Sequence, residues 1–327
     1  MITRRKVLAG TAATAATATT SAALSALPSG VARASAPLLG PSRPTVYRFR
    51  LGDFEVTTLL DGAIRLGGPF PIFGADQTAE TVASFAAENH LPADRMEIAF
   101  TPVIVNTGSQ IILFDTGNGA AGRPDAGNLH DAMALAGYGA DQVDTVVITH
   151  MHPDHIGGLM DGEQPAFARA RYVTAAAEYD FWSNGDRLAD EATRDNAQLV
   201  RRNVMPLAEK TTFIADGDSV ASGITAIDAG GHTPGHMAYH LESEGRRLLL
   251  WADTANHYVM SVQRPEWEVQ FDMDKEAAAA TRRTLFEMAA SDNIPVTGYH
   301  MPFPAVGYID KMAEDFRWVQ ASYQMNL

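Results

Sequence analysis

The sequence contains no cysteine among its 327 residues. A disulfide framework is therefore excluded, and so is any metal site built on thiolate ligands. Basic residues are also few, because 25 lysines and arginines stand against 39 aspartates and glutamates and leave a formal net charge of −14. Such a chain lacks the positive surface with which proteins bind the phosphates of nucleic acids, so we expect no nucleic-acid partner.

The N-terminal region has no apolar run long enough to suggest a membrane anchor, because threonines interrupt it repeatedly. Instead, Arg4-Arg5 precedes a weakly apolar stretch of alanine and threonine, and the small-residue pattern Ala32-Arg33-Ala34 follows it. This arrangement is typical of a twin-arginine export signal with a cleavage site. We therefore expect a signal peptide over residues 1–34 and one mature domain over residues 35–327, periplasmic or secreted and without a stable membrane anchor.

Three imidazoles and one carboxylate are concentrated in one short segment: His150, His152, Asp154 and His155. The residues before them, 143–148, are largely β-branched and predict a buried strand that ends where the segment begins. Alternate residues of an extended chain point the same way, so the first two histidines can bind one metal ion. Pro153 then turns the chain, which lets the aspartate and the third histidine serve a second ion.

Three more candidate ligands lie far downstream, each where a predicted strand ends: His232, Asp253 and His300. Strand ends that open onto one rim of a sheet are where α/β proteins assemble their sites. The alternative, a solvated histidine-rich loop, does not account for this repeated context. Because the candidate ligands come from both halves of the chain, the halves must meet at the site, and we predict one compact domain.

The ordered set of seven residues resembles the metallo-β-lactamase superfamily, in its dinuclear hydrolase branch. The local sequences around the ligands, in residues 152–160, 231–236 and 300–304, are most similar to those of the methyl parathion hydrolase group. The resemblance implies an α/β fold, a four-layer αββα sandwich whose two αβ halves face each other across paired sheets. It also makes a homodimer the expected assembly.

The ligand types and the resemblance together indicate two divalent metal ions. We assign the ligands of the first ion as His150, His152 and His232. We assign those of the second ion as Asp154, His155 and His300, and we expect Asp253 to bridge the two. A set of imidazoles and carboxylates suits zinc, with manganese, cobalt and iron as alternatives.

Two further residues are expected to support the ligands rather than to bind metal. In the resembled family the aspartate at the position of Asp115 is a structural residue behind the ligand loop. His236 follows His232 at a helical spacing, but Pro234-Gly235 interrupts any helix between them, so a supporting role is favoured. Downstream, residues 275–290 predict a helix whose N-cap is Asp272 or Asp274.

This ligand set predicts a dinuclear metal-dependent hydrolase. Neutral imidazoles leave most of the positive charge of the ions uncompensated, so a bridging water is acidified and can attack as hydroxide near neutral pH. The carboxylate ligands Asp154 and Asp253 are the predicted catalytic residues. The expected substrate is a small neutral molecule, namely a carboxylic ester, a lactone or a phosphotriester.

The sequence indicates the substrate less specifically than it indicates the metal ligands. Trp182 and Phe303 are candidates for an apolar pocket wall, and the alternative is that both belong to the core. Residues 118–123 contain no aromatic where the methyl parathion hydrolase group supplies one, which weighs against efficient aryl phosphotriester hydrolysis. The alternative activity is that of an acyl-homoserine lactonase, although Asn256 stands where that family has a tyrosine that contacts substrate, and Tyr258 has the wrong spacing.

A hypothesis of another class is a non-catalytic exported protein that only binds metal. Closed coordination, without an open position for water, would favour it. A carboxylate bridge between two divided ligand sets is instead typical of hydrolytic sites. We therefore favour the enzyme.

Overall fold

The computed structural model describes residues 36–313 and 315–326. The expected signal peptide, residues 1–34, lies outside the described residues. Residues 36–42 carry no regular secondary structure, and the compact fold begins at Arg43. Across the described part of the chain, no helix has the length and apolar character needed to cross a membrane.

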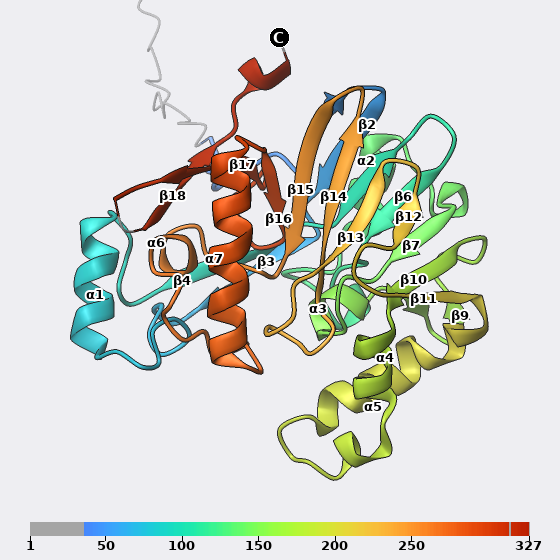
Figure 1. The fold of residues 1–327 in the computed structure, drawn as a ribbon, viewed down its shortest axis with the longest axis horizontal. Helices are drawn as coiled ribbons and strands as arrows, with labels where there is room; N and C mark the ends of the chain where they lie inside the picture. Colours follow the sequence, from blue (N-terminus) through green and yellow to red (C-terminus); the bar gives the residue numbers. More distant parts are fainter. Residues whose placement is uncertain (1–35, 314, 327) are drawn as a thin grey trace, which may run out of the picture. The chain divides into compact units, whose positions relative to one another are not determined.

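One seven-stranded mixed sheet is built from the first part of the chain (Figure 1). Its strands, in spatial order, are β1 (Val46–Leu51), β2 (Phe54–Leu59), β5 (Val103–Asn106), β6 (Ile111–Phe114), β7 (Thr145–Val147), β10 (Arg171–Ala175) and β11 (Thr211–Ile214). β7 runs parallel to both of its neighbours, β6 and β10. All three residues of β7 are buried, as expected for a central parallel strand that is covered on both faces.

The second seven-stranded sheet is built from the last part of the chain. Its strands, in spatial order, are β12 (Ser219–Ala221), β13 (Ile224–Asp228), β14 (Met237–Ser243), β15 (Arg246–Ala252), β16 (Val296–Gly298), β17 (Val306–Lys311) and β18 (Phe316–Gln320). β15 and β16 are parallel, and the other neighbours are antiparallel. The two halves of the chain therefore form one sheet each.

Side chains from both sheets share one buried cluster, so the sheets pack face to face. Phe114 of β6 and Tyr239 of β14 meet there edge to face, with ring centroids 5.1 Å apart. Such an aromatic pair contributes about 0.5–1.5 kcal/mol beyond the burial of its apolar area. The central layers of the fold are thus held by direct contacts between the two halves.

Helices cover the outer face of each sheet. The outer cluster of the first sheet contains residues of α2 (Leu129–Ala136), α3 (Pro153–Ile156), α4 (Ala176–Ser183) and α5 (Arg194–Asn203). The outer cluster of the second sheet contains residues of α6 (Met260–Gln263) and α7 (Lys275–Ser291). The order helix, sheet, sheet, helix confirms the predicted four-layer αββα sandwich.

The helix predicted over residues 275–290 is α7. Its N-cap is Asp274, whose side chain accepts a hydrogen bond from the backbone N–H of Ala277 at 3.0 Å. Asp272, the other candidate, makes different contacts that are described with the site. A cap of this kind contributes about 1 kcal/mol.

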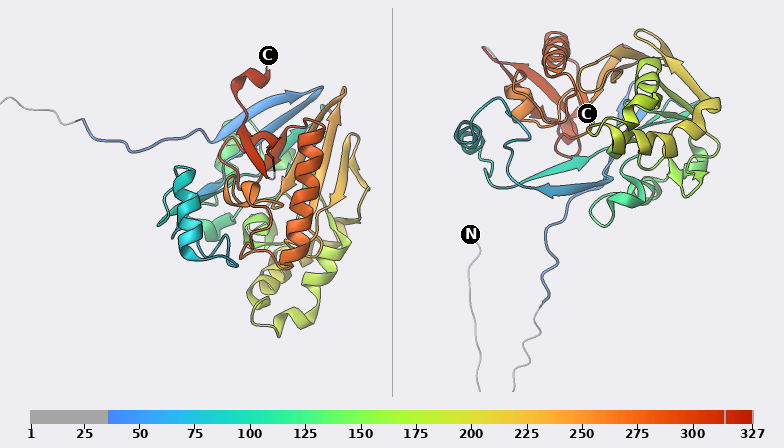
Figure 2. Two further views of the ribbon diagram at one scale, coloured as in Figure 1. Left: turned by 60° about the vertical axis from the view of Figure 1, so that its left-hand side comes forward. Right: turned by 90° about the horizontal axis from the view of Figure 1, so that it is seen from below.

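A separate two-stranded antiparallel sheet lies beside the two large sheets and contributes to the site. It pairs β3 (Gly62–Leu66) with β4 (Met96–Phe100), the blue and teal arrows that lie side by side in Figure 2. The chain between these strands includes α1 (Ala79–Glu88). The remaining short elements are β8 (Met160–Asp161), β9 (Gln164–Pro165) and the 3-10 helices η1 (Gly119–Gly122), η2 (Ala140–Gln142), η3 (Gly185–Leu188), η4 (Met205–Lys210) and η5 (Tyr323–Asn326).

Candidate metal centre

All seven predicted ligands lie together, in two groups. The first group is His150, His152 and His232, and the second is Asp154, His155, Asp253 and His300. Within each group the potential ligand atoms lie within 4.8 Å of one another. This is the division predicted from the sequence, apart from the bridging position expected for Asp253.

Asp253 contacts both groups. Its Oδ2 lies 3.3 Å from Nε2 of His232 in the first group and 3.0 Å from Nε2 of His300 in the second. Its Oδ1 lies 3.2 Å from Nε2 of His155. One carboxylate therefore faces ligand nitrogens on two sides, which is the geometry expected of a bridging ligand.

Each ligand follows the end of a strand. His150 and His152 come after β7, and α3 begins at Pro153 with His152 as its N-cap residue. Asp253 comes directly after β15, and His300 comes shortly after β16. β7 belongs to the first sheet, and β15 and β16 belong to the second. Because the ligands that follow them lie together, the carboxyl ends of these strands open onto the same rim.

The turn that carries His232 requires a close backbone approach. Gly231 has φ +122°, and a Cβ at this position would lie 2.3 Å from the backbone nitrogen of Ala278 in α7. Only glycine fits both the conformation and the space. Gly231 therefore allows the backbone before His232 to lie directly against the first turn of α7.

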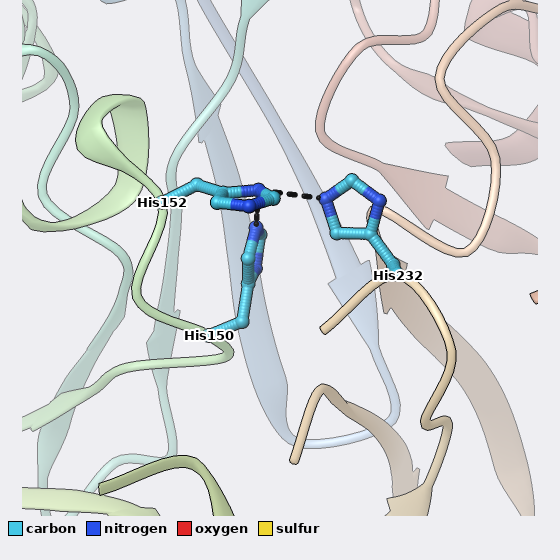
Figure 3. Close-up of side chains that lie close together, drawn as sticks. All are labelled: His150, His152 and His232. Carbon is cyan, nitrogen blue, oxygen red and sulfur yellow. Dashed lines mark hydrogen bonds between the residues drawn. The ribbon is translucent and has the colours of Figure 1, made fainter. Parts of the chain in front are cut away.

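The three histidines of the first group converge on one another (Figure 3). Nδ1 of His152 lies 3.1 Å from Nε2 of His150 and 2.9 Å from Nε2 of His232. Nitrogen lone pairs that meet at such distances need a shared proton or a cation between them. Their arrangement suits a metal that prefers imidazole ligands.

In three of the five candidate ligand histidines, the Nδ1 atom lies within hydrogen-bond distance of a carboxylate or carbonyl oxygen. Nδ1 of His155 lies 2.8 Å from Asp115 Oδ2, Nδ1 of His232 lies 2.9 Å from Asp272 Oδ1, and Nδ1 of His300 lies 2.8 Å from the carbonyl oxygen of Ala99. An imidazole that donates its Nδ1–H keeps an Nε2 lone pair for metal. These contacts therefore select the tautomer that binds an ion.

Two buried atoms show that the site fits metal ions. Nε2 of His155 and Oδ1 of Asp253 have no hydrogen-bond partner among the described residues, although both are buried. They lie 3.2 Å apart. Leaving such polar groups unsatisfied costs about 1–3 kcal/mol each, and a divalent ion would satisfy both.

Burial and charge act differently on the three histidines of the first group. Burial lowers the pKa of His152 to about 3 and lowers the pKa of His150 well below its usual value, so both offer unprotonated nitrogens. Burial opposes protonation of His232 as well, but the carboxylates of Asp253 and Asp272 raise the pKa of His232 to about 9. An ion that binds there must displace this proton, since metal and proton compete for the same nitrogen.

The two expected supporting residues both contact the ligand segments. Asp115, at φ +60°, accepts hydrogen bonds from the backbone and hydroxyl of Thr149 at 2.9 Å, besides its contact with His155. His236 Nδ1 lies 3.0 Å from the carbonyl of Ala229, and its Nε2 accepts from the backbone N–H of Asp253 at 3.1 Å. Both nitrogens of His236 are thus occupied, which leaves none for a metal.

Sequence reasoning missed the role of Asp272. Its carboxylate is buried between Nδ1 of His232 and the guanidinium of Arg282, at 2.9 Å and 2.7 Å. Two acidic residues precede α7, and only one can be its N-cap. Because Asp274 is the N-cap, the sequence left Asp272 without a structural role, and this was the available sign that it does something else.

A cavity of about 430 Å³ opens onto both ligand groups. Its floor contains five of the seven candidate ligands: His152, Asp154, His232, Asp253 and His300. Its walls are largely apolar: Ile64, Leu66, Ile72, Ile98, Phe100, Pro153 and Phe271. Asn118, in the loop that follows β6, completes the lining. The cavity therefore joins a hydrophobic chamber to a polar floor.

The residues that line this cavity do not include Trp182 or Phe303, the two aromatics expected at the pocket wall. Trp182 is buried, and its Nε1–H donates to Glu178 at 2.9 Å. Phe303 is partly buried in the turn before β17. Most of the apolar wall comes instead from the strand pair β3–β4, and Ile72, Pro153 and Phe271 complete it.

Asn256 and Tyr258 are also placed clearly. Nδ2 of Asn256 donates to Oδ2 of Asp253 at 2.9 Å, so this amide orients the candidate bridging carboxylate. Tyr258 lines a different cavity, together with Met96 and Met260. It does not take the place of the tyrosine that the lactonase hypothesis would require beside the metals.

Comparison with known proteins points to one superfamily. Residues 101–293 match the family model described as the metallo-beta-lactamase superfamily. N-acyl homoserine lactonases of Bacillus sp. and Bacillus cereus are each 25% identical over 158 residues, which is 48% of this chain and 55% of theirs. The chain thus spans about half the length of the curated relatives it matches.

Solved structures resemble more of the chain. The dizinc quorum-quenching lactonase AidC, in complex with a product, has a TM-score of 0.77 and 25% identity, covering 85% of this chain and 98% of AidC. The hydrolase AbOPH of the beta-lactamase superfamily has a TM-score of 0.80 and 24% identity, covering 86% and 99%. At 24% identity, the similarity to AbOPH shows a shared fold alone.

Proposed function

The chain belongs to the metallo-beta-lactamase superfamily, and we propose that it is a dizinc hydrolase that opens the lactone ring of N-acyl homoserine lactones. The observation that carries this proposal is the apolar cavity that ends on both ligand groups. It offers a hydrophobic chamber for an acyl chain and a polar floor for the ester bond. The similarity to lactonases in sequence and in structure supports the same substrate class.

The two ligand groups would hold two zinc ions, which would acidify a water molecule and polarise the carbonyl oxygen of the substrate. Asp154 and Asp253 differ in their access to the reaction. The side chain of Asp154 is 20% exposed and lines the cavity, whereas that of Asp253 is 3% exposed. The carboxylate of Asp154 is therefore the group placed to transfer a proton to the leaving oxygen when the ring opens.

The lining of the cavity favours a neutral substrate with an alkyl chain. It contains no lysine or arginine, so it offers no fixed cation to an anionic substrate. Each methylene that moves from water into such an apolar chamber contributes about 0.8 kcal/mol. Ile64, Leu66, Ile72 and Ile98 would supply these contacts and keep water away from the ester.

The second candidate is a small aryl ester or phosphotriester, as in the methyl parathion hydrolase group. Phe100 and Phe271 favour it, because both line the cavity and can pack against an aryl leaving group. Asn118 weighs against it, because this polar residue occupies the loop where the resembled enzymes supply an aromatic. Tyr258 likewise does not reach the position that the lactonase hypothesis requires, so our preference for the lactone rests on the similarity to lactonases.

A substrate panel tests the proposal. The zinc-loaded protein is assayed with N-hexanoyl homoserine lactone, dihydrocoumarin, phenyl acetate and methyl paraoxon, before and after treatment with a chelator. We expect the highest kcat/KM for the acyl homoserine lactone, loss of activity with chelator, and recovery with added zinc. Faster hydrolysis of methyl paraoxon would favour the second candidate, and no turnover of any substrate would reject the hydrolase.

Narrowing the cavity should change the preference for acyl chain length. Ile98 is 5% exposed and lines the chamber, so Ile98→Trp would occupy space that a long acyl chain needs. Each methylene excluded should lower kcat/KM about fourfold, from about 0.8 kcal/mol per methylene. Butanoyl and decanoyl homoserine lactones would be compared in the variant and in the control Leu135→Trp, at an exposed position of α2. Equal effects on both substrates would place the acyl chain elsewhere.

A further inference from the structure

Glu178, on α4, is a fully buried carboxylate that accepts four hydrogen bonds. The donors belong to three segments of the chain: the backbone N–H of Met151 at 2.8 Å, Nε1–H of Trp182 at 2.9 Å, the hydroxyl of Thr233 at 2.8 Å and the backbone N–H of Gly235 at 2.9 Å. Burying a carboxylate is costly unless such donors surround it. The four donors offset this cost, and they tie α4 to two other segments of the chain.

One oxygen of Glu178 holds the segment between two candidate ligands. Met151 stands between His150 and His152, in a stretch without helix or strand hydrogen bonding. Its N–H donates to Glu178 Oε1, and its carbonyl accepts from Nδ2 of Asn196 at 2.9 Å. Buried backbone groups must be paired, and here two side chains take the place of a sheet or helix partner. They determine how the peptide groups beside both histidines are oriented.

The other oxygen holds the segment that follows the third histidine. Glu178 Oε2 accepts from the hydroxyl of Thr233 and from the N–H of Gly235, directly after His232. Gly235 lies so close to α4 that a Cβ there would be 2.2 Å from the backbone nitrogen of Glu178. One carboxylate thus connects the two segments that carry all three histidines of the first ligand group.

The second ligand group is supported by other residues. Asp115 contacts His155, His236 holds the backbone of Asp253, and the carbonyl of Ala99 meets His300. Glu178 makes none of these contacts. Asp115 also holds Thr149, which precedes His150. The hydrogen bonds that Glu178 makes outside α4, by contrast, reach only segments that carry the three histidines of the first group, so a change at Glu178 acts first on that group.

We propose that Glu178 is a positioning residue that sets the zinc affinity of the group formed by His150, His152 and His232, without touching zinc or substrate. It forms no ion pair with a cationic side chain among the described residues, so a dication held by the neighbouring histidines would be the nearby positive charge. This inference rests on the metal-binding part of the proposed function and is independent of the substrate.

Zinc affinity of the metal-free full chain tests the proposal, measured by competition with a chromophoric chelator and without substrate. In Glu178→Gln, an amide NH₂ faces donors that the carboxylate accepted. We expect one zinc ion to bind about 10–100-fold more weakly, as for other residues that orient metal ligands, while the second keeps its affinity. The visible spectrum of the cobalt-substituted protein should change at the weakened site alone, and excess zinc should restore activity.

Asp61→Asn is the matched control. Asp61 is also buried, and its carboxylate accepts four hydrogen bonds, from the backbone and side chain of Asn118 and from the backbones of Gly127 and Leu129. None of these donors is next to a candidate ligand in the sequence, although Asn118 lines the cavity. Asp61→Asn should cost comparable stability and leave both zinc affinities unchanged.

Two results would overturn the proposal: wild-type affinity for both ions in Glu178→Gln, or equal weakening in Asp61→Asn. If Glu178→Gln does not fold, Thr233→Val removes one of the four donors and should still weaken the same ion; unchanged affinity in that variant also overturns the proposal. A wild-type chain that binds two zinc ions but hydrolyses no lactone would reject the proposed substrate and leave the role of Glu178 intact.

Discussion

Replacing Asp253 by alanine is expected to abolish nearly all hydrolysis and to lower the zinc content from two ions per chain to one or fewer. The carboxylate faces ligand nitrogens of both groups, His232 on one side and His155 and His300 on the other. Without it, Asp154 is the only carboxylate left among the candidate ligands, and none remains between the two groups. A bound metal ion supplies several kcal/mol of charge stabilisation, so losing one should lower kcat/KM by about 10³-fold or more.

Zinc content by atomic emission and kcat/KM for the best substrate of the panel would be measured together. Asp161→Ala is the control, because Asp161 is exposed in β8 and its side chain makes no contact with the site. The control should keep two zinc ions and full activity. Two zinc ions and full activity in Asp253→Ala itself would reject the bridging role.

The ligands could be predicted from the sequence because their chemistry and their position agree. Imidazoles and carboxylates that directly follow apolar strands are few in any chain, and the packing of the two sheets brings the positions after β7, β15 and β16 to one rim. The αββα architecture followed from the same reasoning, through the resemblance that the ligand order carries. Where residue type and strand position coincide, the pattern is specific.

The cavity wall could not be predicted in the same way. Most of its residues belong to the strand pair β3–β4, which lies outside both large sheets, and Phe271 comes from the segment before α7. Their packing against the ligand loops depends on tertiary contacts between distant segments. An alternating apolar strand has the same sequence pattern whether it faces a core or a substrate.

The positions of Trp182 and Glu178, both buried, could not be predicted from the sequence either. An aromatic residue near a ligand loop suits a pocket wall and a core equally, and Trp182 is in the core with its indole N–H bonded to Glu178. Glu178 itself stands in a short helix with an ordinary sequence. Its importance arises from donors at Met151, Thr233 and Gly235, which are distant along the chain.

Replacing Arg282 by methionine is expected to destabilise the protein by about 3–5 kcal/mol, because it leaves Asp272 as a buried charge without its cation. Both side chains are fully buried and lie 2.7 Å apart. Arg282 also donates to the carbonyl oxygen of Pro265 at 2.7 Å. Thermal unfolding should show a Tm lower by roughly 10 °C. The zinc affinity should fall as well, since Asp272 orients the ligand His232.

Arg283→Met, at the next position of α7, is the matched control. Arg283 pairs with Glu266 at 2.8 Å, but both side chains are about half exposed, so this change should cost less than about 1 kcal/mol. Adding Asp272→Asn to Arg282→Met removes the uncompensated charge and should recover part of the lost stability. If the double variant is no more stable than Arg282→Met alone, the loss comes from the volume and hydrogen bonds of the arginine, and the charge of Asp272 is balanced by His232.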